Sequence, residues 1–243
     1  MTDEAINIVC LKWGEKYPSQ YVNRLYRMVE RHLDRPFRFF CLTENPQGLD
    51  SQITPLPIEQ EGLQGWWYKL TLFKKNFYDL SGPILYFDLD VVIVGNINFL
   101  VDLPGDFLII RDASRQLMWN SSVMRFRAGQ FAEIWDGFLA EKDQILASYN
   151  GDQEWIFHCV PEASTWPGDK ILSYKKGLKS RAFAFLPKQI CSFLGLRAMQ
   201  FMDTPLEPDA AVIVFHGKPD PEDVMDKPYG LWKKASFVKN NWS

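Results

Sequence analysis

The sequence predicts an α/β fold: a single domain in which helices flank a mixed, mostly parallel central sheet. The chain has 243 residues, of which 47% are apolar, and this is enough to bury a sizeable core. Short apolar runs alternate with helical patterns early in the chain and crowd together late. We find no internal repeat and no low-complexity linker, so one domain is expected over residues 1–243.

The first half of the chain alternates strands with helices. Ile6 to Leu11 and Phe37 to Leu42 are apolar runs of strand length, and Pro18 opens a helical pattern between them. A loop with Pro55 and Pro57 is expected next. Apolar residues at helical spacing predict one stripe on each of two helices: Val22, Leu25, Tyr26, Val29 and Leu33 on the first, and Trp66, Leu70, Phe73 and Phe77 on the second.

The second half contains more strands. Ile84 to Phe87 and Val91 to Val94 are apolar runs that are too short for helices. A helix with Phe131, Ile134, Trp135, Phe138 and Leu139 on one face is expected, and a shorter helix near Asp152. Further strands are predicted at 107–110, 122–126, 171–174, 182–186 and 211–215.

Charge and cysteine content exclude several classes of protein. The net charge of −3 and the isoelectric point near 5.7 provide no general attraction for nucleic acid. The four cysteines lack the close pairing of a zinc site, and reduced buried thiols are expected. The sequence shows no signal-peptide pattern and no apolar run long enough to span a bilayer. We therefore expect a cytoplasmic protein. Peripheral attachment to the inner face of the membrane is an alternative that the sequence leaves open.

The strongest chemical feature is the segment ILYFDLDVVIV, in which Asp88 and Asp90 interrupt an apolar strand pattern. Two residues spaced two apart in a strand point to the same side. Burying two like charges requires a compensating cation, and hard carboxylate oxygens suit Mg²⁺ or Mn²⁺. The simpler alternative is a strand end with two solvated aspartates. A D-x-D segment is also not specific, because phosphatases of the haloacid dehalogenase type carry an apolar strand followed by D-x-D-x-[TV].

Taken with other segments, this motif resembles the retaining glycosyltransferases of family eight, which have the GT-A fold. The resemblance spans most of the chain, from the first strand to the C-terminal loop. The matching segments are Trp67-Tyr68-Lys69-Leu70, ILYFDLDVVIVGNI, Trp119-Asn120-Ser121-Ser122-Val123, Gly151-Asp152-Gln153 and Phe215-His216-Gly217-Lys218-Pro219. Two departures from the family pattern are that Ser122 replaces the usual glycine and that the H-G-K-P segment is shorter.

The resemblance implies a role for each matching residue. Asp88, Asp90 and His216 would bind Mn²⁺ or Mg²⁺, while Lys69, Asp88, Asn120 and Lys218 would hold a UDP-sugar donor. Asp152 and Gln153 would act beside the transferred sugar. Residues 1–100 would form a nucleotide-binding half and residues 101–243 a half for the sugar and acceptor. The implied reaction transfers a hexose with retention to a carbohydrate or glycolipid acceptor. Charge and apolar run lengths separately predict no nucleic-acid partner and no transmembrane segment.

Each residue also has a simpler explanation. A histidine directly after the apolar run 212–215 can complete a metal coordination sphere, but a lone histidine is often a surface group. Lys218 can offset the charge of a leaving diphosphate or lie in a polar loop. Asp152 can cap its helix, Asn120 can be a turn residue and Lys69 an exposed helical lysine. Two other functions stay open: a phosphatase of the haloacid dehalogenase type, and a catalytically silent module that binds nucleotide sugars.

Overall fold

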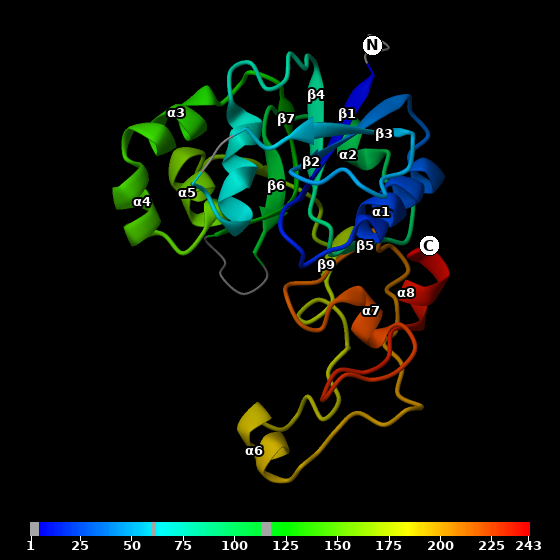
Figure 1. Ribbon diagram of the computed structural model, residues 1–243. Coiled ribbons are helices and arrows are strands. Elements are labelled where there is room, and N and C mark those ends of the chain that lie inside the picture. The colour runs from blue at the N-terminus through cyan, green and yellow to red at the C-terminus, as the bar shows by residue number, and fades with distance from the viewer. Residues whose placement is uncertain (1–4, 60–61, 113–117) are drawn as a thin grey trace. The chain divides into compact units, whose positions relative to one another are not determined.

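The computed structural model describes residues 5–59, 62–112 and 118–243, and these divide into two compact units (Figure 1). The first unit comprises Met1–Tyr26, Asp34–Leu89 and Asn98–Trp166. The second comprises Arg27–Leu33, Asp90–Ile97 and Pro167–Ser243. The division of the chain at residue 100 into nucleotide and sugar halves stays a prediction.

The first unit contains a seven-stranded sheet with the order β3-β2-β1-β4-β7-β6-β8. Strands β3, β2, β1 and β4 run parallel, and β7 is antiparallel to both of its neighbours. This is the mixed, mostly parallel sheet that the sequence predicts. The strands are β1 (Ile6–Lys12), β2 (Phe37–Thr43), β3 (Ile53–Pro57), β4 (Pro83–Phe87), β6 (Leu108–Arg111), β7 (Trp119–Arg127) and β8 (Ser164–Thr165).

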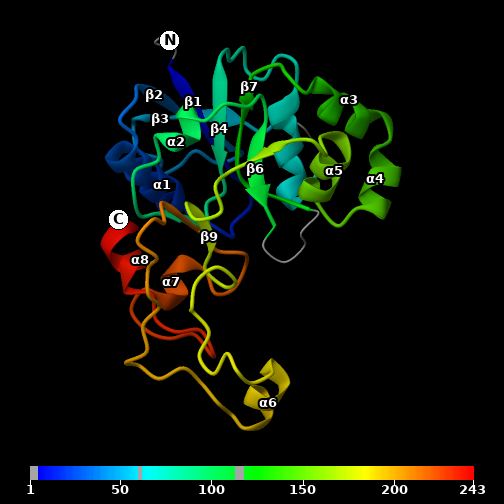
Figure 2. The ribbon, with the colours of Figure 1, turned by 180° about the vertical axis from the view of Figure 1, so that it is seen from behind.

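Helices of the first unit pack against this sheet and against one another. The 3₁₀ helix η1 contacts α3 and α5, and α5 also contacts β7. Figures 1 and 2 show α3, α4 and α5 gathered on one side of the strands. The helices are α1 (Ser19–His32, which continues into the second unit), η1 (Gly65–Phe73), α2 (Phe99–Asp102), α3 (Ala132–Ala140), α4 (Lys142–Ser148) and α5 (Asp152–Cys159).

The core of the first unit is rich in aromatic side chains. The ring of Trp67 stacks on Phe138 of α3 with the centroids 5.5 Å apart. Phe73 lies 4.6 Å from Phe126 of β7. These contacts bind η1 to a helix on one side and to the sheet on the other, so the position of η1 is set by packing.

Residues 65–73 form a 3₁₀ helix, and the α-helical spacing expected through Trp66 and Phe77 is wrong. Trp67, Leu70 and Phe73 are buried, whereas Trp66 is 55% exposed. These three large apolar residues are spaced three apart, which matches the three residues per turn of a 3₁₀ helix, and Lys69, Thr71 and Leu72 between them are buried as well. Packing on both sides of residues 65–73 therefore favours a 3₁₀ helix over the α-helix that the apolar pattern predicted.

Two other predictions about strands are also wrong. The loop expected at Pro55 and Pro57 is strand β3, which tolerates prolines because it lies at the edge of the sheet and needs fewer N–H donors. Residues 182–186 form turns in place of the expected strand. Phe183 there has a φ of +52°, a left-handed conformation that a strand cannot contain.

The second unit is built on a three-stranded sheet with the order β5-β10-β9. Strand β10 (Val212–Val214) pairs antiparallel with β5 (Val91–Ile93) and parallel with β9 (Ile171–Ser173). The rings of Tyr174 and Phe215 stack at 4.5 Å directly after β9 and β10. The short helix α6 (Lys188–Phe193) lies between β9 and β10 in the chain, and α7 (Pro221–Val224) and α8 (Ser236–Asn241) follow β10.

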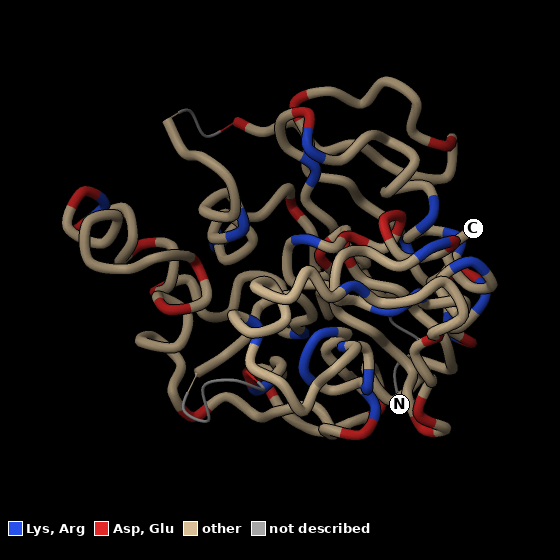
Figure 3. The backbone as a smooth tube through the Cα atoms, turned by 90° about the horizontal axis from the view of Figure 1, so that it is seen from below, with Lys and Arg blue, Asp and Glu red and all other residues tan. Residues whose placement is uncertain are grey.

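Lysine, arginine and acidic residues fall on both units (Figure 3). Within the described residues, no helix has the length and apolar character required to cross a bilayer.

Candidate active site

Asp88 lies at the position in the first unit where open α/β sheets usually bind ligands. It follows β4 directly, at the carboxyl end of that strand. The chain proceeds from β1 outward to β2 and β3 and then places β4 on the opposite side of β1. Ligand sites of such sheets gather at the carboxyl ends of strands where the order reverses in this way. The sheet topology thus independently identifies the end of β4 as a candidate site.

A buried lysine joins two carboxylates at this point. The Nζ atom of Lys69 lies 2.9 Å from Oδ1 of Asp88 and 3.4 Å from Oδ2 of Asp152. It also donates to Oγ of Ser121 at 2.9 Å, and Ser121 Oγ donates to Oδ2 of Asp152 at 2.6 Å. The side chains of Lys69 and Asp152 are only 4% and 5% exposed. We call Lys69, Tyr86, Asp88, Ser121 and Asp152 the lysine-centred cluster.

Tyr86 completes the cluster from within β4. Its hydroxyl donates to Oδ1 of Asp88 at 2.7 Å, and the Lys69 ammonium lies 5.1 Å from the centre of its ring. Tyr86 precedes Asp88 by two residues, so the strand period places the two side chains on the same side. Asp88 is also tied to the sheet through its backbone N–H, which donates to the carbonyl of Ser122 at 2.8 Å.

The surroundings change the acidities of the two carboxylates in opposite directions. Burial alone raises the pKa of Asp88, but attraction to Lys69 and hydrogen bonds from Lys69 and Tyr86 outweigh it, and the pKa falls below its ordinary value. Burial raises the pKa of Asp152, and the attraction of Lys69 offsets only part of that rise. Burial also lowers the pKa of Lys69, but the two carboxylates reverse this and raise it. The cluster therefore keeps Lys69 charged and Asp88 ionised.

Asp152 is the first residue of α5, but it does not cap that helix. Gly151 occupies the cap position, and the carboxylate of Asp152 turns to Ser121 and Lys69. The capping explanation is therefore wrong, and the side chain belongs to the cluster. Gln153 follows on α5 and is half-buried.

Asn120 lies inside β7, so the expectation of a turn residue is also wrong. Its Oδ1 accepts a hydrogen bond from the backbone N–H of Ser122 at 3.1 Å. The pairing of β6 with β7 changes register at Ile109 and Ile110, opposite this part of β7. Asn120 thus stabilises an irregular stretch of strand that brings Ser121 to Lys69.

Sequence reasoning named neither Tyr86 nor Ser121 as a site residue. The strand period was a usable signal for Tyr86, because it places that side chain beside Asp88. Ser121 carried no such signal. Its contacts with Lys69 and Asp152 arise only because η1, β7 and α5 meet in the fold.

Asp90 belongs to the second unit and does not continue strand β4, which ends at Phe87. Leu89 and Asp90 form a turn between β4 and β5. The strand spacing that predicted two carboxylates on the same side therefore does not apply to this pair. In the parts of the chain that the structure describes, no group of three or more acidic, histidine or cysteine side chains is arranged to hold a metal ion.

Within the second unit, strand pairing brings the backbone of Asp90 next to the segment that contains His216. Val91 pairs with Val214, and the N–H of Phe215 donates to the carbonyl of Asp90 at 3.0 Å. His216 is the following residue. Asp90 and His216 therefore leave the same end of the small sheet, as two ligands of one ion would require.

Lys175 holds the loop after His216 in place. Its Nζ atom donates to the carbonyls of His216 and Gly217, the second at 2.9 Å. Lys218 in the same loop forms ion pairs with Asp220 at 3.0 Å and with Asp223 at 2.8 Å. These contacts raise the pKa of Lys218, which is 56% exposed on its side chain. Lys218 therefore already has two acidic partners, and its contact with a diphosphate stays a prediction.

Comparison with known proteins supports the fold that the sequence resemblance implied. No family model matches the sequence, and no curated protein is significantly similar to it. Among solved structures, the galactosyltransferase LgtC in complex with donor and acceptor sugar analogues has a TM-score of 0.59 at 14% identity, covering 88% of each chain. The apo form of the glycosyltransferase GlyE of Streptococcus pneumoniae TIGR4 has a TM-score of 0.60 at 17% identity.

The bifunctional glycosyltransferase WbbM has a TM-score of 0.61 at 11% identity. The chain is covered to 90% by GlyE and to 93% by WbbM, but it spans only 56% and 48% of those two proteins. At these identities the likeness is one of fold. The chain therefore has the GT-A fold of these glycosyltransferases.

Proposed function

We propose that this protein is a metal-dependent glycosyltransferase that transfers a hexose from a UDP-sugar to a carbohydrate or glycolipid acceptor. The observation that carries the proposal is the lysine-centred cluster at the end of β4, in a GT-A fold. An ammonium group that is 4% exposed and bonded to two carboxylates is costly to assemble and adds little stability. Such a group is more readily explained by a role in the chemistry of the site.

In this proposal Lys69 is a positioning residue. The N–H groups of its ammonium are directed at Asp88, Asp152 and Ser121, all within the protein. Lys69 thereby fixes the orientation of Asp88 and Asp152 and keeps Asp88 ionised. Direct contact of Lys69 with donor phosphate, which the sequence resemblance implied, would require one of these bonds to be given up.

The proposed ligands of Mn²⁺ or Mg²⁺ are Asp88, Asp90 and His216. Two carboxylates and one imidazole form a donor set that suits these ions. The pairing of β5 with β10 supports a shared role for Asp90 and His216. When bound, the metal would stabilise the negative charge that develops on the leaving diphosphate.

The remaining residues of the proposed site act on the sugar and the diphosphate. Asp152 and Gln153 would orient the transferred sugar and stabilise positive charge at its anomeric carbon, and Asn120 would hold the donor. Lys218 would exchange Asp220 and Asp223 for the diphosphate, which is a more strongly charged partner. The acceptor would attack from the face that the nucleotide leaves, with retention of configuration.

The test is UDP release from a panel of UDP-sugars, measured with and without Mn²⁺ for the wild type and for Asp90→Asn. We expect metal-stimulated release that the variant lacks, because an amide is a weaker ligand than a carboxylate. Lys142→Gln, a change on the surface helix α4, is the matched control and should keep wild-type release. The anomeric configuration of the product, determined by NMR, tests retention.

Three results would contradict the proposal. Metal-stimulated release that Asp90→Asn leaves unchanged would remove the metal role. Binding of UDP without turnover of any sugar would indicate the silent binding module. Hydrolysis of simple phosphomonoesters without UDP binding would indicate the phosphatase.

A further inference from the structure

The second unit contains a basic segment of which the proposed site uses only Lys175, through its bonds to the loop after His216. Between Asp169 and Asp203 the sequence has no acidic residue, although the whole chain has a net charge of −3. The same stretch has seven basic residues: Lys170, Lys175, Lys176, Lys179, Arg181, Lys188 and Arg197. We call residues 175–202, which include α6, the basic arm.

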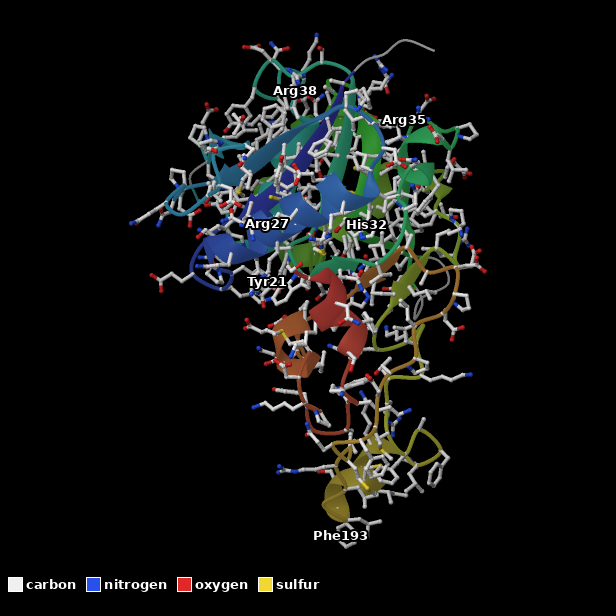
Figure 4. All side chains as sticks on the ribbon, turned by 90° about the vertical axis from the view of Figure 1, so that its right-hand side faces the viewer. Tyr21, Arg27, His32, Arg35, Arg38 and Phe193 are labelled. Carbon is white, nitrogen blue, oxygen red and sulfur yellow. The ribbon has the colours of Figure 1, made fainter. Side chains whose placement is uncertain are left out.

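The basic arm also exposes large apolar side chains. Phe193, Phe185 and Phe201 are 90%, 82% and 78% exposed, the highest values for large apolar residues in the described structure. Ile190, Leu194 and Met199 are exposed as well. Figure 4 shows Phe193 at the far end of α6, pointing away from the ribbon. Apolar groups gathered in this way usually mark a surface that contacts a partner.

Backbone hydrogen bonds hold the basic arm in its conformation. The N–H of Ala182 donates to the carbonyl of Leu231 at 2.8 Å, and that of Ala198 donates to the carbonyl of Gly230 at 2.8 Å. The Lys188 ammonium also lies 5.2 Å from the ring centre of Trp232. Residues 230–232 therefore anchor the arm on both sides of α6, and the exposed phenylalanines extend from a formed structure.

We infer that the basic arm docks on an anionic lipid surface. Phenylalanine and leucine side chains can insert at the boundary of headgroups and acyl chains, while lysine and arginine remain at the phosphates. Each basic residue near an anionic leaflet adds attraction. The basic arm itself holds six of the seven basic residues, all but Lys170, and it contains no acidic residue.

Charge and side-chain type favour a lipid surface over other partners. A second copy of the chain would bring two basic arms together, and their like charges would repel. Stacking on nucleic-acid bases requires aromatic rings, and it gives no role to Ile190, Leu194 and Met199. The apolar interior of a bilayer accepts both the aromatic and the aliphatic side chains that the basic arm exposes.

The experiment measures binding of the full chain to sedimented lipid vesicles. One set contains phosphatidylcholine alone and the other contains phosphatidylglycerol in addition. We expect binding to the anionic vesicles only, and binding that weakens as salt rises. Two double variants, Phe185→Ser with Phe193→Ser and Lys188→Glu with Arg197→Glu, should each weaken partitioning roughly tenfold or more.

Matched controls lie on the first unit. Leu139→Ser removes an exposed apolar residue of α3, and Lys75→Glu reverses an exposed basic residue. Both should bind as the wild type does. Circular dichroism and the melting temperature of every variant check that it is folded, and UDP release in solution should be unchanged by the arm variants because they leave the proposed site residues intact.

Failure of the inference is distinguishable from failure of the proposed function, because vesicle binding requires no donor sugar. Folded wild-type protein that ignores anionic vesicles would overturn the inference, as would double variants that bind them normally. A dimer in ultracentrifugation that Phe185→Ser with Phe193→Ser dissociates, without vesicle binding, would show that the surface is an interface between copies.

Discussion

The buried ammonium group of Lys69 affects both the geometry of the candidate site and the stability of the protein around it. Its ammonium touches Asp88, Asp152 and Ser121, and each contact lies within 3.4 Å. Removing one partner of a buried ion pair leaves the other charge uncompensated, which is strongly destabilising. A neutral residue at this position would therefore affect both the orientation of Asp88 and the local stability.

We predict that Lys69→Met lowers kcat/KM for UDP-sugar turnover by roughly a hundredfold or more, a loss typical of removing one preorganised electrostatic group. Lys69→Arg is expected to keep part of the activity, because it retains the charge but not the compact shape of the ammonium group. Steady-state UDP release measures both. A Lys69→Met protein with a wild-type kcat/KM would exclude a role for the cluster in the reaction.

At the scale of elements, contacts across the fold determine which secondary structure forms and where. Segment 65–73 becomes a 3₁₀ helix between α3 and the sheet, and β3 accepts two prolines because it lies at the edge. Arg125 of β7 is another such contact. Its guanidinium donates to the carbonyls of Leu100, Val101, Leu103 and Gly105 over distances of 2.6–3.0 Å.

Arg125 thereby ties α2 and the loop after it to the central sheet. We predict that Arg125→Met lowers the free energy of unfolding by about 3 kcal/mol, because four carbonyls lose a charged donor and the site is buried. Urea denaturation measures the change. Arg127→Met, at the exposed end of the same strand, is the control and should cost less than about 1 kcal/mol. Equal effects of the two variants would contradict the anchoring role of Arg125.

Asp203 links the end of the basic arm to the start of α8. Its Oδ1 accepts from the backbone N–H of Ser236 and from that of Thr204, both at 3.0 Å. Burial alone raises the pKa of Asp203, but hydrogen bonds from Ser236 and Thr204 outweigh it and lower the pKa. A lowered pKa in the folded state means that the carboxylate adds stability above its ordinary pKa and loses this contribution as the pH falls.

We predict that Asp203→Ala lowers the free energy of unfolding at pH 7 by at most about 1 kcal/mol, because the side chain is largely exposed. The difference from the wild type should shrink as the pH falls from 7 towards about 3, since both proteins then lack the charge. Urea titrations at several pH values measure it. If the wild type and Asp203→Ala differed more in free energy of unfolding at low pH than at pH 7, the ionised form of Asp203 would not be the stabilising one.

At the scale of the whole molecule, the structure consists of two compact units, each with its own sheet. The chain crosses between the units at Leu89 and Asp90, so the D-x-D motif supplies one aspartate to each. Three of the four cysteines, Cys10, Cys41 and Cys191, are buried, Cys159 is half-buried, and all four are free. The burial of three of them agrees with the buried thiols expected from the sequence, whereas Cys159 is less buried than expected.

The thiols provide a test that involves the whole molecule. Burial, assisted by repulsion from Glu133, raises the pKa of Cys159 to about 12, which leaves little thiolate at neutral pH. We predict that the native protein reacts slowly with a thiol reagent such as Ellman's reagent, and that all four thiols react quickly in guanidinium chloride. Rapid reaction of several thiols in the native protein would mean that its core opens readily.

The sequence by itself determined the fold class and most of the strands, because apolar periodicity and strand length are local properties of the chain. It also named Lys69, Asp88 and Asp152 as candidate site residues, and the structure brings these three side chains together. The roles of all the named residues stay predictions: Lys69, Asp88, Asp90, Asn120, Asp152, Gln153, His216 and Lys218. The metal and the UDP-sugar donor were inferred from residue types and from resemblance, and both belong to the proposed function.

Only the tertiary structure decided how these residues act on one another. The bond between Ser121 and Asp152 joins residues 31 positions apart, and that between Lys69 and Ser121 joins residues 52 positions apart. No local pattern encodes such contacts, because they depend on how η1, β7 and α5 pack. The turn at Leu89 and Asp90 and the edge position of β3 depend in the same way on neighbouring strands, since hydrogen-bond partners and burial are supplied by residues far away in sequence.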